Sequence, residues 1–160
     1  MATIYCALAS NLGDREKNLR AALTQLAAQV ALTRVSSIYE SSPPDAPTRW
    51  LTLVCAATTR LAPIDVLRHT RRIETEMGRV DGLRSEPRPI DIDLLLYDTR
   101  IALSPALTLP HPRLHERAAV LVPLIEIAPT LVHPRRRVPL RALLAQLPPT
   151  PTVKFYLPFT

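Results

Sequence analysis

The order of its apolar segments limits the folds open to this chain. Two segments repeat apolar residues at helical spacing, and four shorter ones are apolar and rich in β-branched side chains, which is typical of strands. We expect helices over residues 15–30 and 63–77, and strands over residues 3–8, 31–39, 50–61 and 91–97. This βαββαβ order predicts a ferredoxin-like α+β fold, in which two helices cover one face of an antiparallel sheet.

Local signals mark the ends of these elements. Asp14 or Asn11 follows the first strand and can cap the first helix. Pro63 suits the first turn of the second helix, and Gly78 is placed to end it. A proline-rich tail closes the chain and is expected to be ordered only where it docks. Before this tail we expect a C-terminal helical appendix, with short helices over residues 117–128 and 139–147.

Length and composition predict one soluble unit. The chain has 160 residues, of which 47% are hydrophobic, so a single domain over residues 1–160 can bury a sizeable core. No apolar run approaches the roughly 20 residues that a membrane helix needs, and residues 1–8 do not resemble a secretory leader. We therefore expect a cytoplasmic protein that binds no membrane. Cys6 and Cys55 lie in apolar segments and are expected to be buried, reduced thiols.

An excess of positive charge favours anionic partners. The formal net charge is +6 and comes almost entirely from arginine, which suits nucleotides or nucleic acids, although arginines spread over a solvated surface give the same total. The chain has only three glycines and contains neither a GxxxxGK[ST] phosphate loop nor a GxGxxG fingerprint. A bound nucleotide would therefore be held by side chains and a metal ion.

Asp91 and Asp93 are the strongest candidates for a chemical site. Residues two apart on a strand face the same way and lie about 7 Å apart. Two like charges at this spacing repel each other, and Mg²⁺, which binds one or two carboxylates plus substrate phosphates, relieves the repulsion. Arg88 lies just upstream and has a guanidinium group suited to phosphate oxygens. The pattern indicates a site for a metal and a nucleotide; the alternative is an exposed strand end in which Arg88 pairs with an acid.

Several motifs occur together in the order found in one enzyme family. The most specific set is Pro87-Arg88-Pro89-Ile90-Asp91-Ile92-Asp93-Leu94, then Leu109-Pro110-His111-Pro112, then Arg117. Weaker matches are residues 9–14, 36–39, Asn18-Leu19, Glu74, Gly78-Arg79 and Pro123-Leu124. On these residues the chain resembles the 6-hydroxymethyl-7,8-dihydropterin pyrophosphokinases of folate biosynthesis, from the first strand to about residue 147.

The resemblance implies an enzyme that moves pyrophosphate from ATP to the hydroxymethyl group of the pterin and leaves AMP. It implies that Asp91 and Asp93 bind two Mg²⁺ ions and form the catalytic site with Arg79 and Arg88. The partners implied are small molecules, with no nucleic acid, and a monomer is expected. The ATP-binding positions would be Glu74, Arg88, Thr108, His111 and Arg117, and the pterin-binding positions Ser41, Trp50, Thr52 and Asp91.

Departures from the family pattern gather on the pterin side. The resemblance leads us to expect an aromatic ring where the chain has Ala119, an asparagine where it has Thr52, and a loop tryptophan where it has Ser85. A lost stacking ring removes about 1 kcal/mol beyond its buried area. Trp50 occupies another stacking position and can compensate. The identity of the acceptor therefore stays open.

Other functions stay open beside this one. The chain can be a paralogue that uses the same chemistry on a different pterin or a related alcohol, or it can be a non-catalytic nucleotide-binding module. A basic ferredoxin-like domain can also bind RNA on its sheet. Aromatic residues make up only 4% of the chain, however, so few rings are available to stack on bases.

Overall fold

The computed structural model describes residues 1–43, 48–80, 87–149 and 152–160. Strands and helices follow one another in the expected order as far as the strand that carries both aspartates. The elements are β1 (Ala2–Ser10), α1 (Arg15–Leu26), β2 (Ala31–Val35), β3 (Ile38–Ser42), β4 (Trp50–Thr59), α2 (Pro63–Glu76), β5 (Asp91–Tyr97), β6 (Ala102–Leu103), β7 (Thr108–Leu109), a 3₁₀ turn (Leu114–Glu116), α3 (Ala118–Ile127), α4 (Leu140–Ala145) and β8 (Thr152–Leu157).

An antiparallel sheet of six strands forms the centre of the described structure. Its order is β5-β1-β4-β3-β8, and β2 pairs with β4 beside β3. The two long central strands pair from Ala2 opposite Thr59 to Ser10 opposite Leu51. The ferredoxin-like α+β fold is therefore confirmed, with β8 added at one edge.

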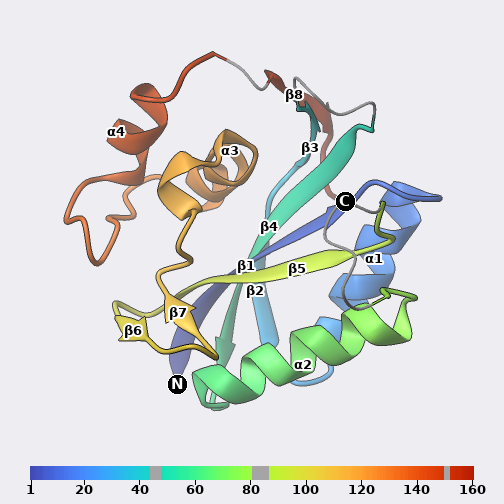
Figure 1. Ribbon diagram of the computed structural model, residues 1–160, viewed down its shortest axis with the longest axis horizontal. Helices are drawn as coiled ribbons and strands as arrows, with labels where there is room; N and C mark the ends of the chain where they lie inside the picture. Colours follow the sequence, from blue (N-terminus) through green and yellow to red (C-terminus); the bar gives the residue numbers. More distant parts are fainter. Residues whose placement is uncertain (44–47, 81–86, 150–151) are drawn as a thin grey trace.

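Helices cover both faces of this sheet (Figure 1). α1 and α2 lie on one face, where Leu23 and Ile73 belong to a buried apolar cluster that includes residues of β1 and β4. α3 and α4 lie on the other face, where Leu121 and Leu143 belong to a second buried cluster. The expected C-terminal appendix is thus the second helical layer, and the sheet is buried between the two layers.

The strand expected over residues 31–39 is two strands, which corrects the prediction. Val35 pairs with Cys55 and Tyr39 pairs with Thr52, so four steps along the outer strand match three steps along β4. The outer strand therefore has one extra residue between Val35 and Tyr39. Ser36 lies in this interval and is fully buried. Its backbone N–H donates to the carbonyl of Val54 at 2.9 Å, and its hydroxyl accepts the N–H of Val54, also at 2.9 Å. The serine hydroxyl thus completes the hydrogen bonding where the strand is interrupted.

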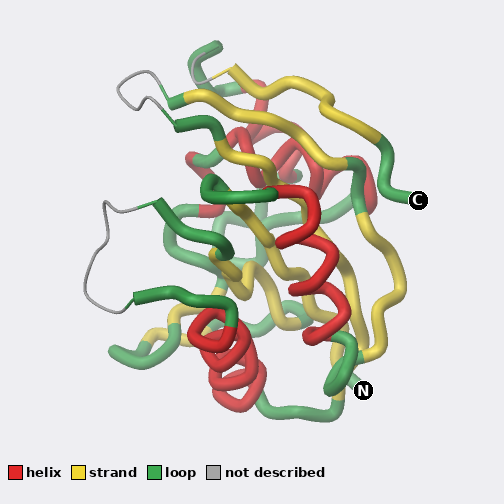
Figure 2. The backbone as a smooth tube through the Cα atoms, turned by 90° about the vertical axis from the view of Figure 1, so that its right-hand side faces the viewer, coloured by secondary structure: helices red, strands yellow, loops and turns green. Residues whose placement is uncertain are grey.

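The chain end also forms regular structure that the sequence pattern did not predict. β8 pairs antiparallel with β3, with Glu40 opposite Lys154, and runs along the outer edge of the sheet (Figure 2). Arg20 on α1 then holds the terminus, because its guanidinium lies 4.7 Å from the ring centre of Phe159 and donates to the carbonyl of Thr160. The residues that follow the proline-rich segment therefore form an edge strand of the sheet.

Helix ends follow the local signals, with one correction. Asp14 caps α1 by accepting the N–H of Lys17 at 3.1 Å, and Pro63 begins α2, as expected. The helix expected over residues 15–30 ends at Leu26, because a turn follows it and brings Val30 into the core. No helix within the described ranges has both the length and the apolar character needed to cross a bilayer.

Candidate active site

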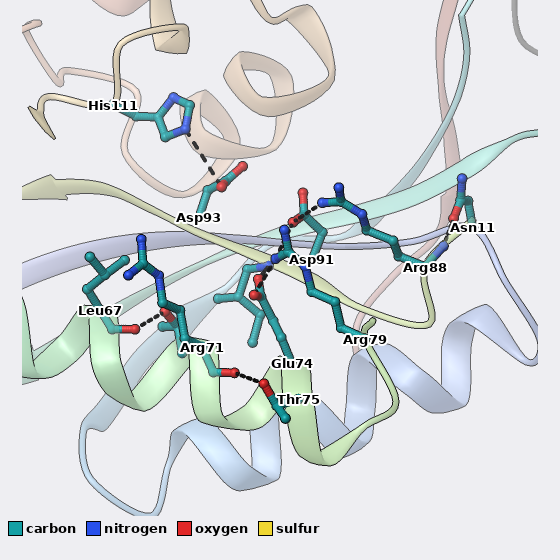
Figure 3. A network of polar contacts seen from close by, with 12 residues as sticks. Asn11, Leu67, Arg71, Glu74, Thr75, Arg79, Arg88, Asp91, Asp93 and His111 are labelled. Carbon is teal, nitrogen blue, oxygen red and sulfur yellow. Dashed lines mark hydrogen bonds and ion pairs between the residues drawn. The ribbon is translucent and has the colours of Figure 1, made fainter. Parts of the chain in front are cut away.

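Asp91 and Asp93 lie at the start of β5, an outer strand of the sheet. They pair with Ala9 and Ala7 of β1, and both are only partly buried, whereas Ile92 between them is buried. Side chains from α2, from the loop before β5 and from the segment after β7 meet around the two carboxylates (Figure 3). The expected pair of carboxylates at a strand end therefore sits among cationic groups.

Two arginines contact Asp91. Its Oδ1 lies 3.3 Å from Nη1 of Arg88 and 3.4 Å from Nη1 of Arg79, and the two guanidinium groups flank it in Figure 3. Burial raises the pKa of Asp91, and the nearby charge of Asp93 raises it further, against the lowering effect of both arginines. Additional positive charge, such as that of a bound cation, would therefore stabilise the ionised form of Asp91.

Asp93 has a different environment. Its Oδ2 accepts a hydrogen bond from Nη1 of Arg117 at 2.9 Å, and its Oδ1 lies 3.7 Å from Nε2 of His111. Burial acts to raise the pKa of Asp93, but the hydrogen bonds and charges of His111 and Arg117 outweigh it and lower the pKa to about 2. Asp93 is therefore ionised at neutral pH and offers a full negative charge.

Glu74 of α2 supports the strand from its free edge. Its side chain is only 3% exposed, its Oε1 accepts the backbone N–H of Ile92 at 2.7 Å, and its Oε2 pairs with Arg79. Gly78, with φ of 101°, turns the chain back at the end of α2, so that the N–H of Arg79 donates to the carbonyl of Glu74 at 3.0 Å. One glutamate thus positions both the aspartate strand and one of its arginines.

Asn11 holds the other arginine, which the sequence reasoning did not foresee. Its N–H donates to the carbonyl of Arg88 at 3.1 Å, and its side-chain Oδ1 accepts the N–H of Arg88 at 2.6 Å. This two-way pairing fixes the loop before β5 to the end of β1. The two residues are 77 positions apart in sequence, and the motif around Asn11 gave only a turn or a helix cap.

A pocket of about 280 Å³ opens beside Asp91. It brings together all four positions expected to bind the pterin, and Arg117 and Ala119 also line it. The sequence did not identify Arg113 and Glu116 as pocket residues. The two form an ion pair at 2.7 Å. Their position a few residues after the His-Pro motif was the signal that could have identified them. The lining residues are Ala9, Ser41, Pro43, Trp50, Thr52, Asp91, Arg113, Glu116, Arg117, Ala118 and Ala119.

The other expected positions lie around this pocket but not in it. Thr108 and His111 line a separate hollow, although His111 still points its Nε2 at Asp93. Arg79 and Arg88 line a third, smaller hollow of about 180 Å³ near the end of α2. Ser85, one of the departures on the pterin side, lies outside the described residues.

The two aspartates fit a magnesium site that a substrate completes. Within the ranges that the structure describes, no three His, Cys, Asp or Glu side chains come together to hold a metal ion by themselves. Mg²⁺ does not need such a cage, because it is usually held by one or two carboxylates together with substrate phosphates and water. The partly buried pair offers carboxylate oxygens of the kind that this mode of binding uses.

Comparisons with known proteins agree with this geometry. The model of the 7,8-dihydro-6-hydroxymethylpterin-pyrophosphokinase (HPPK) family matches residues 5–129. The chain is 36% identical to the 2-amino-4-hydroxy-6-hydroxymethyldihydropteridine pyrophosphokinase of Aquifex aeolicus, over 88% of this chain and 89% of that protein. It is 40% identical to the folic acid synthesis protein fol1 of Schizosaccharomyces pombe, over 90% of this chain but only 20% of that protein.

A solved structure supports the fold as well. Wild-type Plasmodium falciparum HPPK-DHPS, solved with STZ-DHP, matches 91% of this chain with a TM-score of 0.74 at 14% identity, and the match covers 43% of that longer chain. The chain thus spans about a fifth of one long relative and almost all of another. The family model and the Aquifex relative establish the family expected from the motifs: this chain is a member of the 7,8-dihydro-6-hydroxymethylpterin-pyrophosphokinase family.

Proposed function

We propose that this protein transfers a pyrophosphoryl group from ATP to the hydroxymethyl group of 6-hydroxymethyl-7,8-dihydropterin and releases AMP, a reaction of folate biosynthesis. One observation carries the proposal: the Asp91 carboxylate contacts Arg79 and Arg88 and also lines the pocket that contains Trp50. A polyphosphate held by the arginines and an acceptor held in the pocket would therefore meet at this carboxylate.

The cationic side chains would bind the polyphosphate of ATP. Arg79, Arg88 and Arg117 each contact one of the two aspartates, so their guanidinium groups surround the place where the transferred phosphates would lie. Guanidinium groups match phosphate oxygens with parallel N–H donors. Phosphoryl transfer depends mainly on such positioning and charge stabilisation. His111 would add a further donor beside Asp93.

Two further residues are proposed for the ATP side. Glu74 would act by holding Arg79 in place, since both of its carboxylate oxygens are engaged in the structure. Thr108 would offer its hydroxyl to the nucleotide from β7, on the same side as His111.

Asp91 and Asp93 would bind Mg²⁺, for which two ions are expected. When bound, Mg²⁺ neutralises phosphate charge and orients the attacking and leaving oxygens. The contribution of the protein is to place two carboxylates on one face of a strand that Glu74 supports at its free edge. The arginines around the pair stabilise the ionised carboxylates in a partly buried site before the metal and the nucleotide bind.

The pocket beside Asp91 would bind the acceptor. Trp50 would stack on the flat ring, and Ser41, which pairs with Trp50 across β3 and β4, would offer a buried hydroxyl to the ring edge together with Thr52. A planar heterocycle with a polar edge suits this combination of one aromatic face and two hydroxyl groups.

The direct test is product analysis with Mg-ATP and 6-hydroxymethyl-7,8-dihydropterin. We expect AMP and the pyrophosphorylated pterin in equal amounts. Asp91→Asn should abolish the reaction, whereas Asp65→Asn, which changes an exposed acid paired with Arg68 on α2, should leave it unchanged. Formation of ADP, or no turnover at saturating substrate, would contradict the proposal. Nucleotide binding without turnover would identify a non-catalytic module.

A second candidate is the same transfer to a different pterin or a related alcohol. Ala118 and Ala119 make part of the pocket wall small, and Thr52 stands where an asparagine was expected, so the pocket could accept a larger or differently substituted ring. Comparing kcat/KM over a panel of hydroxymethyl pterins and related alcohols tests this candidate. If 6-hydroxymethyl-7,8-dihydropterin is the best acceptor, the candidate is removed.

We also propose that residues 1–160 act as a single domain, as a monomer and in the cytoplasm, on small molecules and not on nucleic acid. The support for small-molecule ligands is that ATP and a pterin would together fill the pocket and pair with the cationic groups at the aspartates. Light scattering during size-exclusion chromatography tests the monomer, because an elution mass of twice 17.8 kDa would contradict it.

A further inference from the structure

The outer strands at the two sides of the central sheet differ in how their free edges are closed. On β5, the N–H of Ile92 is bonded to Glu74 at 2.7 Å. Further along the same strand, the carbonyl of Leu95 accepts the N–H of His111 at 2.9 Å. On the opposite side, β8 pairs only with β3, and no described strand continues the sheet beyond it (Figure 1). An edge strand of this kind presents unpaired N–H and C=O groups along its outer side.

Two neighbouring aromatic side chains of β8 are exposed. Phe155 is 61% exposed and Tyr156 is 44% exposed, although the whole chain has only one tryptophan, four tyrosines and two phenylalanines. Tyr156 has no opposite residue on β3, because the register shifts between Phe155 and Leu157, so residues 152–155 form the regular part of the edge. Aromatic residues are enriched where proteins bind one another. Two of these few rings on one open edge strand therefore favour an interaction surface.

The inner side of β8 and the chain end hold the strand in place. Leu157 and Phe159 pack against the apolar cluster that α1 and α2 share with the sheet. Arg20 of α1 contacts the ring of Phe159 and donates to the carbonyl of Thr160 at 3.1 Å. A strand that is already ordered loses less conformational freedom when a partner binds. The edge is thus a preformed surface.

One charge on β8 restricts what can pair with it. Lys154 is exposed, and its ammonium group makes no ion pair with another residue in the described part of the chain. Glu40, which lies opposite Lys154 on β3, is already paired with Arg15 and Arg49. On a strand added at the outer edge, a carboxylate opposite Lys154 is favoured and a cation is disfavoured. The net charge of +6 on each molecule opposes pairing with a second copy.

We propose that β8 is a docking strand for an extended segment of another polypeptide, which carries a carboxylate opposite Lys154 and apolar side chains against Phe155 and Tyr156. The segment adds antiparallel to residues 152–155, and its backbone pairs with the outward N–H and C=O groups of the edge. No residue of β8 lines the acceptor pocket, so the proposal goes beyond the transfer reaction and does not depend on it.

The strand β3 shows which side chains complement β8. The ring of Tyr39 lies opposite Phe155 and meets it edge to face, with ring centres 6.1 Å apart. Glu40 lies opposite Lys154. Because the side chains of a strand stand roughly perpendicular to the sheet, they meet the neighbours on both sides. A segment with the chemistry of β3 is therefore a suitable probe for the outer edge.

The test titrates the full chain with a synthetic peptide that has the sequence of residues 36–42, SSIYESS, and follows the backbone amide signals by NMR. We expect saturable shifts centred on residues 152–156, and a dissociation constant about fivefold weaker when lysine replaces the glutamate of the peptide. Lys154→Glu should reverse this preference. Lys17→Glu is the matched control, because it makes the same change of charge at the only other lysine, which is exposed on α1, and should keep the preference of the wild type.

Phe155→Ser should weaken binding of the peptide by about tenfold. Because this variant also loses the contact with Tyr39, the charge reversal at Lys154, which keeps the apolar contacts of β8, decides the test.

Several results would overturn the proposal. One is the absence of saturable shifts at millimolar peptide, and another is the same peptide preference in the wild type and in Lys154→Glu. Shifts centred on residues 50–52 of β4 would mean that the peptide replaces β3 inside the sheet. A doubling of the molecular mass that Phe155→Ser abolishes would assign the edge to a second copy of the chain.

Discussion

The Oε1 atom of Glu74 accepts the backbone N–H of Ile92 at 2.7 Å, from the free edge of β5. Ile92 lies between the two aspartates, so this bond fixes the strand at the point where both carboxylates begin. The other oxygen of Glu74 pairs with Arg79. A helix side chain thus replaces the missing neighbouring strand at this edge and couples the two aspartates proposed to bind metal to an arginine proposed to bind phosphate.

Replacing Glu74 by alanine should destabilise the fold and reduce activity together. The substitution leaves the buried N–H of Ile92 without an acceptor and Arg79 without its partner, and an unsatisfied buried group costs about 1–3 kcal/mol. Urea unfolding should show this loss in the free energy of unfolding. Glu76→Ala, at an exposed acid on the same helix, is the control and should change it little. Equal stability of the two variants would show that the contacts of Glu74 with Ile92 and Arg79 do not stabilise the fold.

Ser36→Ala should destabilise the protein more than its small size suggests. The hydroxyl accepts the N–H of Val54 at 2.9 Å in a fully buried position. We expect a loss of about 1–3 kcal/mol in the free energy of unfolding, measured with urea. Ser42→Ala, at an exposed end of β3, should have almost no effect. A similar small effect at both serines would show that the Ser36 hydroxyl does not stabilise the break between β2 and β3.

Ala119→Phe should improve binding of the proposed pterin acceptor. The pocket contains one aromatic ring, that of Trp50, and a phenyl group at position 119 would add a second face. A well-placed ring pair contributes about 0.5–1.5 kcal/mol beyond its area. We therefore expect the KM for 6-hydroxymethyl-7,8-dihydropterin to fall by up to about tenfold in steady-state kinetics, with the KM for ATP unchanged. A rise in the pterin KM would instead favour a bulkier natural acceptor.

Glu126 should make the stability of the fold sensitive to acid. Some loss of hydration acts to raise the pKa of this exposed residue, but hydrogen bonds from Tyr39 at 2.6 Å and from Ser37 lower the pKa below the ordinary value of 4.5. The folded state therefore favours the ionised carboxylate. Its stabilising contribution is complete above the ordinary pKa and disappears as the pH falls through the lowered value.

The measurement is the free energy of unfolding from about pH 6 to about pH 3, the range in which carboxyl groups titrate. The wild type should lose more stability over this range than Glu126→Gln, because the amide cannot be protonated in the same way. Glu116, whose pKa is also lowered, accepts one side-chain hydrogen bond, from Arg113, so Glu116→Gln serves as a control with a smaller effect. Parallel curves for the wild type and Glu126→Gln would contradict the assignment.

Local sequence signals were sufficient for the strand that carries the site. Alternation placed Asp91 and Asp93 together, and Pro63, Gly78 and Asp14 set the ends of the two helices that the βαββαβ order requires. These features depend on residues close in sequence, where propensity and spacing carry most of the information.

Long-range contacts could not be predicted in the same way. Asn11 meets Arg88 across 77 positions, and His115 meets His133 through a turn whose closure depends on its own hydrogen bonds. The pairing of β8 with β3 depends on a free sheet edge that exists only once the sheet has formed. The one-residue mismatch at Ser36 likewise reflects the register with β4, which no periodicity within residues 31–39 records.

The most direct test of the account measures how magnesium changes the affinity for a non-hydrolysable ATP analogue, by calorimetry, in the wild type and in Asp91→Asn/Asp93→Asn. Magnesium should tighten binding to the wild type by about tenfold or more. In the double variant this enhancement should vanish, although binding without metal should persist, because Arg88 and Arg117 keep their positive charge when their contacts with the two aspartates are lost. An undiminished magnesium effect in the double variant would contradict the claim that these two carboxylates hold the metal.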